Sequence, residues 1–531
     1  MSFVVSNSTI LKTTNDAFRD ERTYGAGKDV DRLVTIRPDR LDDSAMLDLE
    51  RAAKEDGDTR SARAAAAIVK ARNGETNIAV PNFKAFYSIL SSYLEANAKN
   101  GWIFITGADG NAYPELVTNI LITLPSRTEE EKVVIRSVYY GHSYNGDKIC
   151  YSKNSHTFQP ASLRGRRVAD ILSDYGIQVA TDELIAAHEA SIARYQKLVA
   201  GHFAEQYRFT GTVLATENRW DTQISAKGRR VIHDLSTSDY APYSRLEDSS
   251  ILIEDEGIVP EHPVVRVFDL GTHDFYWVHE SYLTPYVYDH SIREKLILPR
   301  THHDLLEILT EDLDAFIDDI VEGKATGNVV LCKGQPGVGK TTTAEAYSEI
   351  MEKPLYRIHA GSLGTTAETI SKNIKVILDR ALRWNCVLLL DEADVFIKKR
   401  GDNLEQNAVV AEFLRALEYI NAASLIFLTT NRPDDIDDAI ISRCAAIIEY
   451  LAPTPADMRR IWEVYNVHFK AGMDDALMDQ LIEMFPGIVA RDANRLLRLV
   501  LRTAKKRDTP INADLFRRCA MFRAIKMADH S

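Results

Sequence analysis

Residues 328–341 read NVVLCKGQPGVGKT, and this stretch decides the fold of the C-terminal part of the chain. A run that favours a β-strand, residues 328–332, precedes the pattern G-x-x-x-x-G-K-T, and the residues after it favour a helix. In that setting the glycines let backbone N–H groups close around phosphate oxygens, and the helix N-terminus adds positive potential. The stretch therefore predicts a phosphate-binding loop made of Gly334, Gln335, Pro336, Gly337, Val338, Gly339, Lys340, Thr341 and Thr342.

Lys340 and Thr341 carry the chemistry that this loop predicts. The lysine ammonium group can reach the β- and γ-phosphates of ATP, and the threonine hydroxyl can ligate Mg²⁺. A glycine-rich turn that arose by chance is the alternative. It leaves the lysine, the threonine and both flanking elements unexplained, so we expect ATP and Mg²⁺ to bind here.

An apolar run that ends in two carboxylates lies at residues 386–392, which read CVLLLDE. In α/β sheets ligands bind at the carboxyl ends of the strands, where Asp391 and Glu392 would lie. We expect Asp391 to hold Mg²⁺, directly or through water, and Glu392 to orient and deprotonate the attacking water. Taken alone, the run also fits a buried strand followed by a solvated acidic turn.

The next apolar run, residues 424–431, reads SLIFLTTN and ends in Asn431, whose amide can polarise the same water. The letters DEAD at residues 391–394 are also those of a helicase class. Those helicases carry a Ser-Ala-Thr motif on a following strand. Here the strand ends in an asparagine after two threonines, so the helicase interpretation is disfavoured.

The pattern of elements predicts an α/β fold with several domains, because 531 residues are too many for one core. From residue 328 short apolar runs alternate with helical stretches, which indicates a parallel sheet with helices on both faces. Upstream, residues 264–270 and 275–279 predict a β-hairpin. The expected domains are an N-terminal arm or helical extension (1–75), a mixed α/β domain (76–205), a β-rich domain (206–296), the ATP-binding domain (297–452) and a helical lid (453–531).

Together these motifs resemble those of AAA+ ATPases, and the resemblance covers residues 297–531. It implies a P-loop module with a parallel sheet, flanking helices and a lid, and Asn431 as its sensor 1 residue. Residues 275–280 (FYWVHE), 285–289 (PYVYD) and 295–299 (KLILP) look like a group of mostly uncharacterised AAA ATPases with a β-rich domain directly before the motor. This resemblance implies ATPase activity and a homo-oligomeric ring, with a hexamer as the expected form.

Two further segments of the resemblance supply arginines. Ser-Arg-Cys around Arg443 is similar to a clamp-loader segment whose arginine enters the neighbouring subunit's site, which implies an arginine finger. Arg432 is a rival for this role, and a surface ion pair is the alternative. The segment GIVARD resembles sensor 2 of the lid, which implies that Arg491 approaches the γ-phosphate within its own subunit. Arg495 is the second candidate there, and a solvated arginine-rich helix is the alternative.

The partner is less well defined by the sequence. Residues 358–367, where threading motors carry an aromatic pore residue, contain no Phe, Tyr or Trp. We expect a protein client held by the N-terminal domains; the alternative is a clamp-loader-like switch coupled to nucleic acid. The formal charge of −13 argues against a chain coated in nucleic acid, but residues 491–526 hold eleven Arg or Lys against three Asp.

The beginning of the chain shows no basic segment followed by a long apolar run, and no apolar run approaches the roughly 20 residues that span a bilayer. The five cysteines form no C-x-x-C pair, which fits a reducing compartment. We therefore expect a cytoplasmic protein with no membrane partner.

Overall fold

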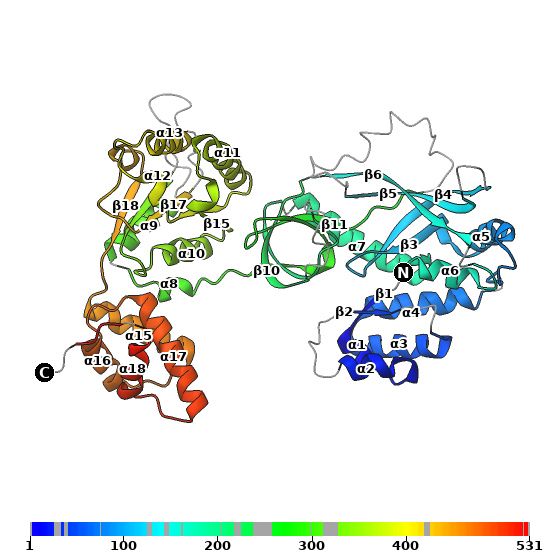
Figure 1. Cartoon of the computed structure of the whole chain (residues 1–531), viewed down its shortest axis with the longest axis horizontal. Coiled ribbons are helices and arrows are strands. Elements are labelled where there is room, and N and C mark those ends of the chain that lie inside the picture. The colour runs from blue at the N-terminus through cyan, green and yellow to red at the C-terminus, as the bar shows by residue number, and fades with distance from the viewer. Residues whose placement is uncertain are drawn as a thin grey trace. The chain divides into compact units, whose positions relative to one another are not determined.

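The computed structural model describes residues 3–25, 33–36, 41–74, 76–124, 130–142, 148–160, 163–201, 203–216, 225–236, 258–298, 300–311, 328–418, 425–523 and 525–528. The chain divides into two compact units, Met1–Tyr286 and Val287–Ser531. Figure 1 labels the elements of both units.

The first unit begins with a small helical part that has its own core. Asp42 caps one of its helices by accepting the N–H of Ala45, and Gly57 ends that helix with a φ of +78°. The stretch interpreted from the sequence as an arm or helical extension thus packs around buried apolar side chains, among them Val5, Ile10, Met46, Leu49 and Ala65. The elements are β1 (Phe3–Ser6), α1 (Asn7–Leu11), α2 (Arg19–Gly25), β2 (Leu33–Ile36), α3 (Asp43–Asp56) and α4 (Thr59–Arg72).

A five-stranded antiparallel sheet follows, in the order β6-β5-β4-β3-β7. Phe86 and Leu90 of α5 and Ile171 of α6 are buried in one core with residues of the sheet. The strands are β3 (Trp102–Thr106), β4 (Ala112–Thr123), β5 (Lys132–His142), β6 (Ile149–Phe158) and β7 (Ile177–Val179), and the helices are α5 (Phe83–Asn97), α6 (Val168–Asp174) and α7 (Asp182–Gly201).

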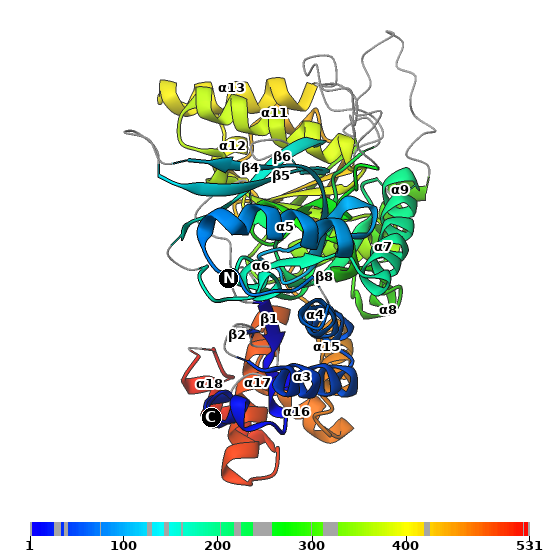
Figure 2. The same cartoon turned by 90° about the vertical axis from the view of Figure 1, so that its right-hand side faces the viewer.

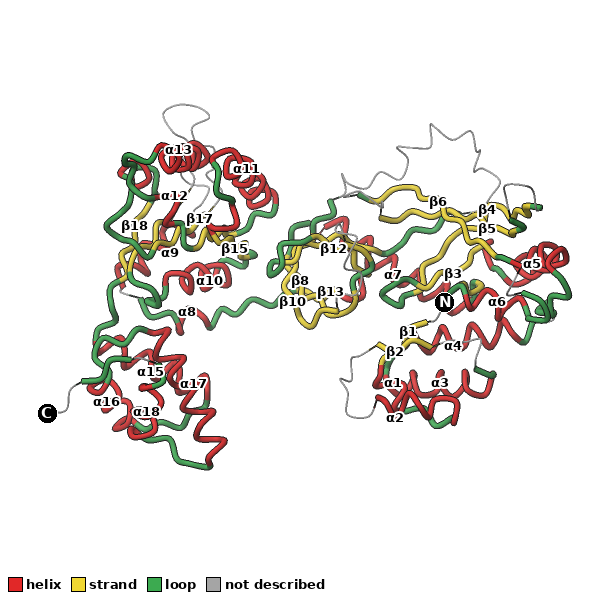
Figure 3. The backbone as a smooth tube through the Cα atoms, in the orientation of Figure 1, coloured by secondary structure: helices red, strands yellow, loops and turns green. Residues whose placement is uncertain are grey.

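A six-stranded antiparallel sheet completes the first unit, in the order β13-β8-β10-β11-β12-β9. Figure 3 shows its strands curling around a common axis. The predicted hairpin is confirmed, since β11 and β12 pair antiparallel with Phe268 opposite Phe275. The strands are β8 (Gln206–Thr212), β9 (Ala215–Thr216), β10 (Ser225–His233), β11 (Val264–Asp269), β12 (Phe275–His279) and β13 (Leu283–Pro285).

The second unit contains a five-stranded parallel sheet in the order β15-β16-β17-β14-β18. Figures 1 and 2 show α11 and α13 side by side on one face, and Figure 1 shows α10 on the other. The predicted α/β fold class is therefore confirmed. The strands are β14 (Asn328–Gly334), β15 (Leu355–His359), β16 (Val387–Asp391), β17 (Leu425–Thr430) and β18 (Ala446–Tyr450). The helices are α8 (Ile292–Lys295), α9 (Arg300–Glu311), α10 (Lys340–Ile350), α11 (Ala367–Arg383), α12 (Asp394–Ile397), α13 (Leu404–Glu418) and α14 (Asp438–Ile441).

The C-terminal part of the second unit is helical, as predicted, with α15 (Pro455–Phe469), α16 (Asp475–Met484), α17 (Ala490–Arg507) and α18 (Ala513–Met521). Trp462, Leu481, Leu496 and Phe516, one from each helix, are fully buried in a shared core. Within the described parts of the chain, no helix combines the length and the apolar character that crossing a bilayer requires.

Candidate nucleotide site

The loop predicted to bind phosphate lies between β14 and α10 and is shaped by glycines with positive φ. The φ angles of Gly334, Gly337 and Gly339 are +148°, +89° and +108°, which residues with side chains rarely adopt. A β-carbon at Gly334 would lie 2.3 Å from the carbonyl oxygen of Tyr450 on β18. The loop therefore needs glycine both for its turn and for close contact with the adjacent strand.

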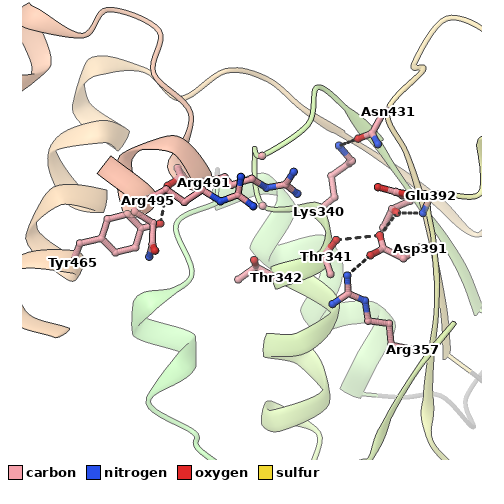
Figure 4. Close-up of a pocket in the computed structure, with 15 residues that line it drawn as sticks. Lys340, Thr341, Thr342, Arg357, Asp391, Glu392, Asn431, Tyr465, Arg491 and Arg495 are labelled. Carbon is pink, nitrogen blue, oxygen red and sulfur yellow. Dashed lines mark hydrogen bonds and ion pairs between the residues drawn. The ribbon is translucent and has the colours of Figure 1, made fainter. Parts of the chain in front are cut away.

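The ammonium group of Lys340 lies inside this loop. Its Nζ donates to the carbonyl oxygens of Gly334 at 2.8 Å and Gln335 at 2.7 Å. It also donates to Oδ1 of Asn431 at 3.0 Å, the bond drawn in Figure 4. Burial lowers the pKa of Lys340, and the positive charge of Arg491 adds to this effect. An anion that entered the loop would meet a buried cation with adjacent backbone N–H groups.

Asp391, at the carboxyl end of β16, accepts three side-chain hydrogen bonds (Figure 4). Oδ1 accepts from the hydroxyls of Thr341 at 3.1 Å and Thr429 at 2.6 Å, and Oδ2 accepts from the guanidinium of Arg357 at 2.6 Å. Burial opposes ionisation of Asp391. The hydrogen bond from Thr429 and the charge of Arg357 outweigh that effect and hold the pKa of the carboxyl below its usual value.

The oxygens of Thr341 and Asp391 fit the requirements of Mg²⁺. They lie 3.1 Å apart, so one ion with part of its water shell can contact both. Protein sites for Mg²⁺ commonly supply one or two carboxylates and leave the other positions to phosphates and water. Among the described residues, no group of three or more His, Cys, Asp or Glu is arranged to hold a metal.

Glu392 has a φ of +57°, an uncommon conformation for a residue with a side chain. Its N–H donates to the hydroxyl of Thr429 at 3.0 Å, and the N–H of Ala393 donates to the carbonyl oxygen of Thr429 at 2.8 Å. These bonds hold the sharp turn at the end of β16, and Glu392 lines the cavity beside Asp391 (Figure 4). Backbone strain of this kind clusters at functional sites.

A polar cavity of about 300 Å³ brings most of the predicted site residues together. Arg491 and Arg495 of α17 both line it, so the structure does not choose between them. Val338 lines a neighbouring cavity, and Gly334 and Gln335 contact Lys340 through their carbonyl groups. The predicted residues that line the polar cavity are Gly337, Gly339, Lys340, Thr341, Thr342, Asp391, Glu392, Asn431, Arg491 and Arg495.

The other predicted residues lie outside the described lining of the polar cavity, namely Arg443, Arg432 and Pro336. Arg443 follows α14, and its guanidinium donates to the carbonyl oxygen of Ala439 at 3.0 Å. Arg432 is exposed, and its N–H donates to the hydroxyl of Thr430 at 3.0 Å. Neither arginine lines the polar cavity within the described part of its own chain.

Sequence reasoning missed five residues of the lining: Arg357, Thr429, Tyr465, Ala490 and Asn494. Arg357 is a charged residue within a strand that borders β16, and Thr429 lies two residues before Asn431, so both positions carried a weak signal. Tyr465 and Asn494 come from the lid, and no sequence pattern indicates that they reach the cavity.

A second, largely apolar cavity of about 480 Å³ adjoins the polar one, and the two share Gly339, Thr342, Tyr465 and Ala490. A polar compartment beside an apolar one suits a ligand with a charged tail and a flat ring. The apolar lining includes Leu296, Ile297, Leu298, Val338, Leu451 and Ile461.

Comparison with known proteins identifies the class of the second unit. The family model described as ATPase family associated with various cellular activities (AAA) matches residues 330–450. For residues 330–450 this match confirms the resemblance to AAA ATPases drawn from the sequence. Domains of this family bind nucleotide and hydrolyse ATP, and rings with arginine fingers are typical of them.

The relatives each match less than half of the chain. Over 234 residues the chain is 27% identical to the human ATPase family gene 2 protein homolog B, a match that covers 42% of this chain and 29% of that protein. It is 27% identical over 191 residues to the ribosome biogenesis ATPase RIX7 of Saccharomyces cerevisiae, covering 34% of this chain and 23% of that one. The match thus spans less than a third of either relative.

One solved structure gives a partial match at low identity. The AAA domain of FIGL-1 in complex with ADP is 20% identical, with a TM-score of 0.36, and the match covers 44% of this chain and 84% of that chain.

Proposed function

We propose that residues 287–531 bind ATP with Mg²⁺ and hydrolyse it to ADP and phosphate. The observation that carries this proposal is that Lys340, Asp391, Glu392 and Asn431 converge on one polar cavity. They supply a buried ammonium group, an ionised carboxylate, a second carboxylate and an amide. Transfer of a phosphoryl group to water needs these parts for charge neutralisation and for positioning of the water.

Each residue has a distinct proposed role. Lys340 exchanges its carbonyl partners for oxygens of the β- and γ-phosphates. Thr341 and Asp391 hold Mg²⁺, which neutralises phosphate charge when it is bound. Glu392 accepts the proton of the attacking water, and Asn431 orients that water.

The lid completes the polar cavity. Arg491 or Arg495 contacts the γ-phosphate, which supports closure of the lid over ATP rather than over ADP. The hydrogen bond of 3.2 Å from the N–H of Arg491 to the carbonyl oxygen of Gly337 supports this role, because it joins α17 directly to the phosphate loop.

The adenine ring occupies the apolar cavity in this proposal. The lining of this cavity includes Leu296, Ile297 and Leu298, and Ile461 of the lid also contributes to it. Because Leu296 lies ten residues after Tyr286, the last residue of the first unit, nucleotide binding can change the strain on the connection between them.

We assign Arg443 to the site of a neighbouring subunit, as an arginine finger. Its position outside the described lining of its own polar cavity supports this assignment, as does the ring assembly typical of AAA ATPases. The proposed assembly is a homo-oligomeric ring, with a hexamer as the expected form. Arg432 is the second candidate for the finger.

We propose a protein as the client, held by the first unit. That unit is compact and has several hydrophobic cores, so it is far more than a linker. The proposed domains of the chain are 1–75, 76–205, 206–296, the large ATPase domain at 297–452 and the lid at 453–531, and the first unit ends within the third of them, at Tyr286. Residues 358–367 contain no Phe, Tyr or Trp, which supports a grip on the client by another part of the chain.

A nucleic-acid-coupled switch is the second candidate, and one surface of α17 favours it. Basic residues recur there at helical spacing beyond Arg491 and Arg495, and each can neutralise a backbone phosphate. The exposed residues of this stripe are Arg498, Arg502, Lys505 and Lys506.

One experiment separates the two candidates. Stimulation of ATPase activity by a cell extract is measured before and after nuclease treatment, and the Glu392→Gln variant is then used to capture the bound partner. A protein client predicts stimulation that survives nuclease. Stimulation that disappears with nuclease, and that an Arg498→Ala/Arg502→Ala variant also lacks, favours the nucleic-acid switch.

A further inference from the structure

Arg357 is a cation of the polar cavity that the proposed roles leave unused. It lies on β15 opposite Leu389 of β16, and its guanidinium reaches the carboxylate two residues further along that strand. One terminal nitrogen lies 2.6 Å from Oδ2 of Asp391, and the other lies 3.6 Å from Oε1 of Glu345 on α10. Figure 4 shows the guanidinium directed at Asp391 from below, with Lys340 above.

The guanidinium of Arg357 is accessible to a ligand in the polar cavity. Its side chain is 39% exposed and lines the same cavity as Lys340 and Thr341. Its Nε is buried and has no hydrogen-bond partner among the described residues. Since a guanidinium remains protonated at any physiological pH, a permanent positive charge lies against the carboxylate proposed to bind Mg²⁺.

We propose that Arg357 is a positioning residue that compensates the charge of Asp391 when Mg²⁺ is absent, and so lets the site accept nucleotide without the metal. The inference rests on the proposed nucleotide site. A free carboxylate at Asp391 would repel the triphosphate that Lys340 attracts. The guanidinium cancels that repulsion, and Glu345 offers it a second anionic partner when Mg²⁺ is bound.

The size of the effect follows from the charges involved. Two unit charges about 5 Å apart, at an effective dielectric constant near 20, would change binding by more than about a hundredfold, and solvent screening of the partly exposed guanidinium reduces the expected change to about tenfold. Loss of the guanidinium should therefore weaken metal-free binding by that factor. With Mg²⁺ present the loss should be small, because the ion supplies the positive charge.

The test uses the full-length chain and a fluorescent ATP analogue. The Kd of the analogue is measured in EDTA and in excess MgCl₂. The Kd in EDTA divided by the Kd in MgCl₂ is the metal enhancement. We expect Arg357→Ala to raise the Kd in EDTA by about tenfold, to leave the Kd in MgCl₂ within about twofold, and so to raise the enhancement about tenfold. Arg357→Lys keeps the charge and should keep most of the wild-type enhancement.

The matched control is Arg415→Ala, which removes an arginine that pairs with Glu412 on α13 outside the described lining of the cavity. It should not change the enhancement. Arg357→Gln provides a second neutral variant, and the thermal unfolding midpoints of both neutral variants identify loss of folding.

Three results would overturn the proposal. In the first, Arg357→Ala and Arg357→Gln both bind the analogue as tightly as wild type in EDTA and in MgCl₂. In the second, both neutral variants weaken binding by the same factor with and without metal, as loss of a structural ion pair would. In the third, wild type binds the analogue in neither condition, and the proposed nucleotide site then fails as well. Lys340→Ala distinguishes these cases, because it should remove binding in both conditions only if the site itself is correct.

Discussion

The ammonium nitrogen of Lys340 lies 3.0 Å from Oδ1 of Asn431, although 91 residues separate the two along the chain. The contact joins the phosphate loop after β14 to the end of β17. These strands are neighbours in parallel register, with Cys332 opposite Thr429. One strand pair therefore places the proposed phosphate-binding lysine beside the proposed water-orienting amide.

This contact leads to the first prediction. Asn431→Ala should retain ATP binding within a few fold, because Lys340 keeps its two carbonyl partners, but should lower the hydrolysis rate by roughly 10²-fold through loss of the amide dipole. Lys340→Ala should abolish ATP binding. Binding by calorimetry and phosphate release by a coupled assay check both variants; normal turnover by Asn431→Ala would remove this residue from the mechanism.

The second prediction concerns the glycine at the start of the phosphate loop. Gly334→Ala should destabilise the second unit by about 2 kcal/mol or more, since the added β-carbon meets the backbone of β18 and the φ of +148° disfavours a side chain. The control is Gly361→Ala, where no atom lies within 4 Å of the added carbon. Thermal unfolding of both variants should give a lower midpoint for Gly334→Ala alone, and equal midpoints would contradict the described packing.

Activity should depend on contact between subunits, which is the third prediction. Arg443→Ala and Glu392→Gln chains should each be nearly inactive alone. A mixture should regain part of the activity, at interfaces where an intact arginine faces an intact carboxylate. Phosphate release across mixing ratios and protein concentrations tests this. Turnover that is independent of concentration, with no recovery on mixing, would argue against Arg443 as a finger in trans.

The fourth prediction tests the apolar cavity as the site of the adenine ring. Leu451 lines that cavity and is 76% exposed, so an aspartate there should not disturb the core. Leu451→Asp should raise the Kd for ATP by about tenfold, because a carboxylate would face the ring. Val467→Asp is the matched control, at a residue that is 79% exposed and lies outside the described lining. If the two variants bound ATP with equal affinity, the adenine ring would have to bind outside the apolar cavity.

The loop and the two strand-end motifs were predictable because each is continuous in sequence. Lys340, Asp391 and Asn431 follow apolar runs, and in a parallel sheet the carboxyl ends of such strands lie at one edge. Their convergence on one cavity is therefore expected from the residue pattern alone. The same reasoning yields the α/β class of the second unit.

Arg357 and Tyr465 could not be predicted in this way. Arg357 reaches Asp391 only because of the register between β15 and β16 and the direction of its side chain, and a single sequence shows neither. Tyr465 belongs to the lid helix α15 and lines both cavities, and a single sequence does not show which lid residues reach them. The core of residues 3–72 was not predicted, because the apolar residues that form it are few and are spread among many polar and charged residues.

The central claim is that Glu392 activates water for hydrolysis of ATP bound at Lys340, and one comparison tests it most directly. ATP binding and phosphate release are measured for wild type and Glu392→Gln under identical conditions with Mg²⁺. The amide keeps the shape of the side chain but cannot accept the proton. We predict that Glu392→Gln binds ATP as tightly as wild type and releases phosphate at least about 10²-fold more slowly. Full hydrolysis by purified Glu392→Gln would contradict the account.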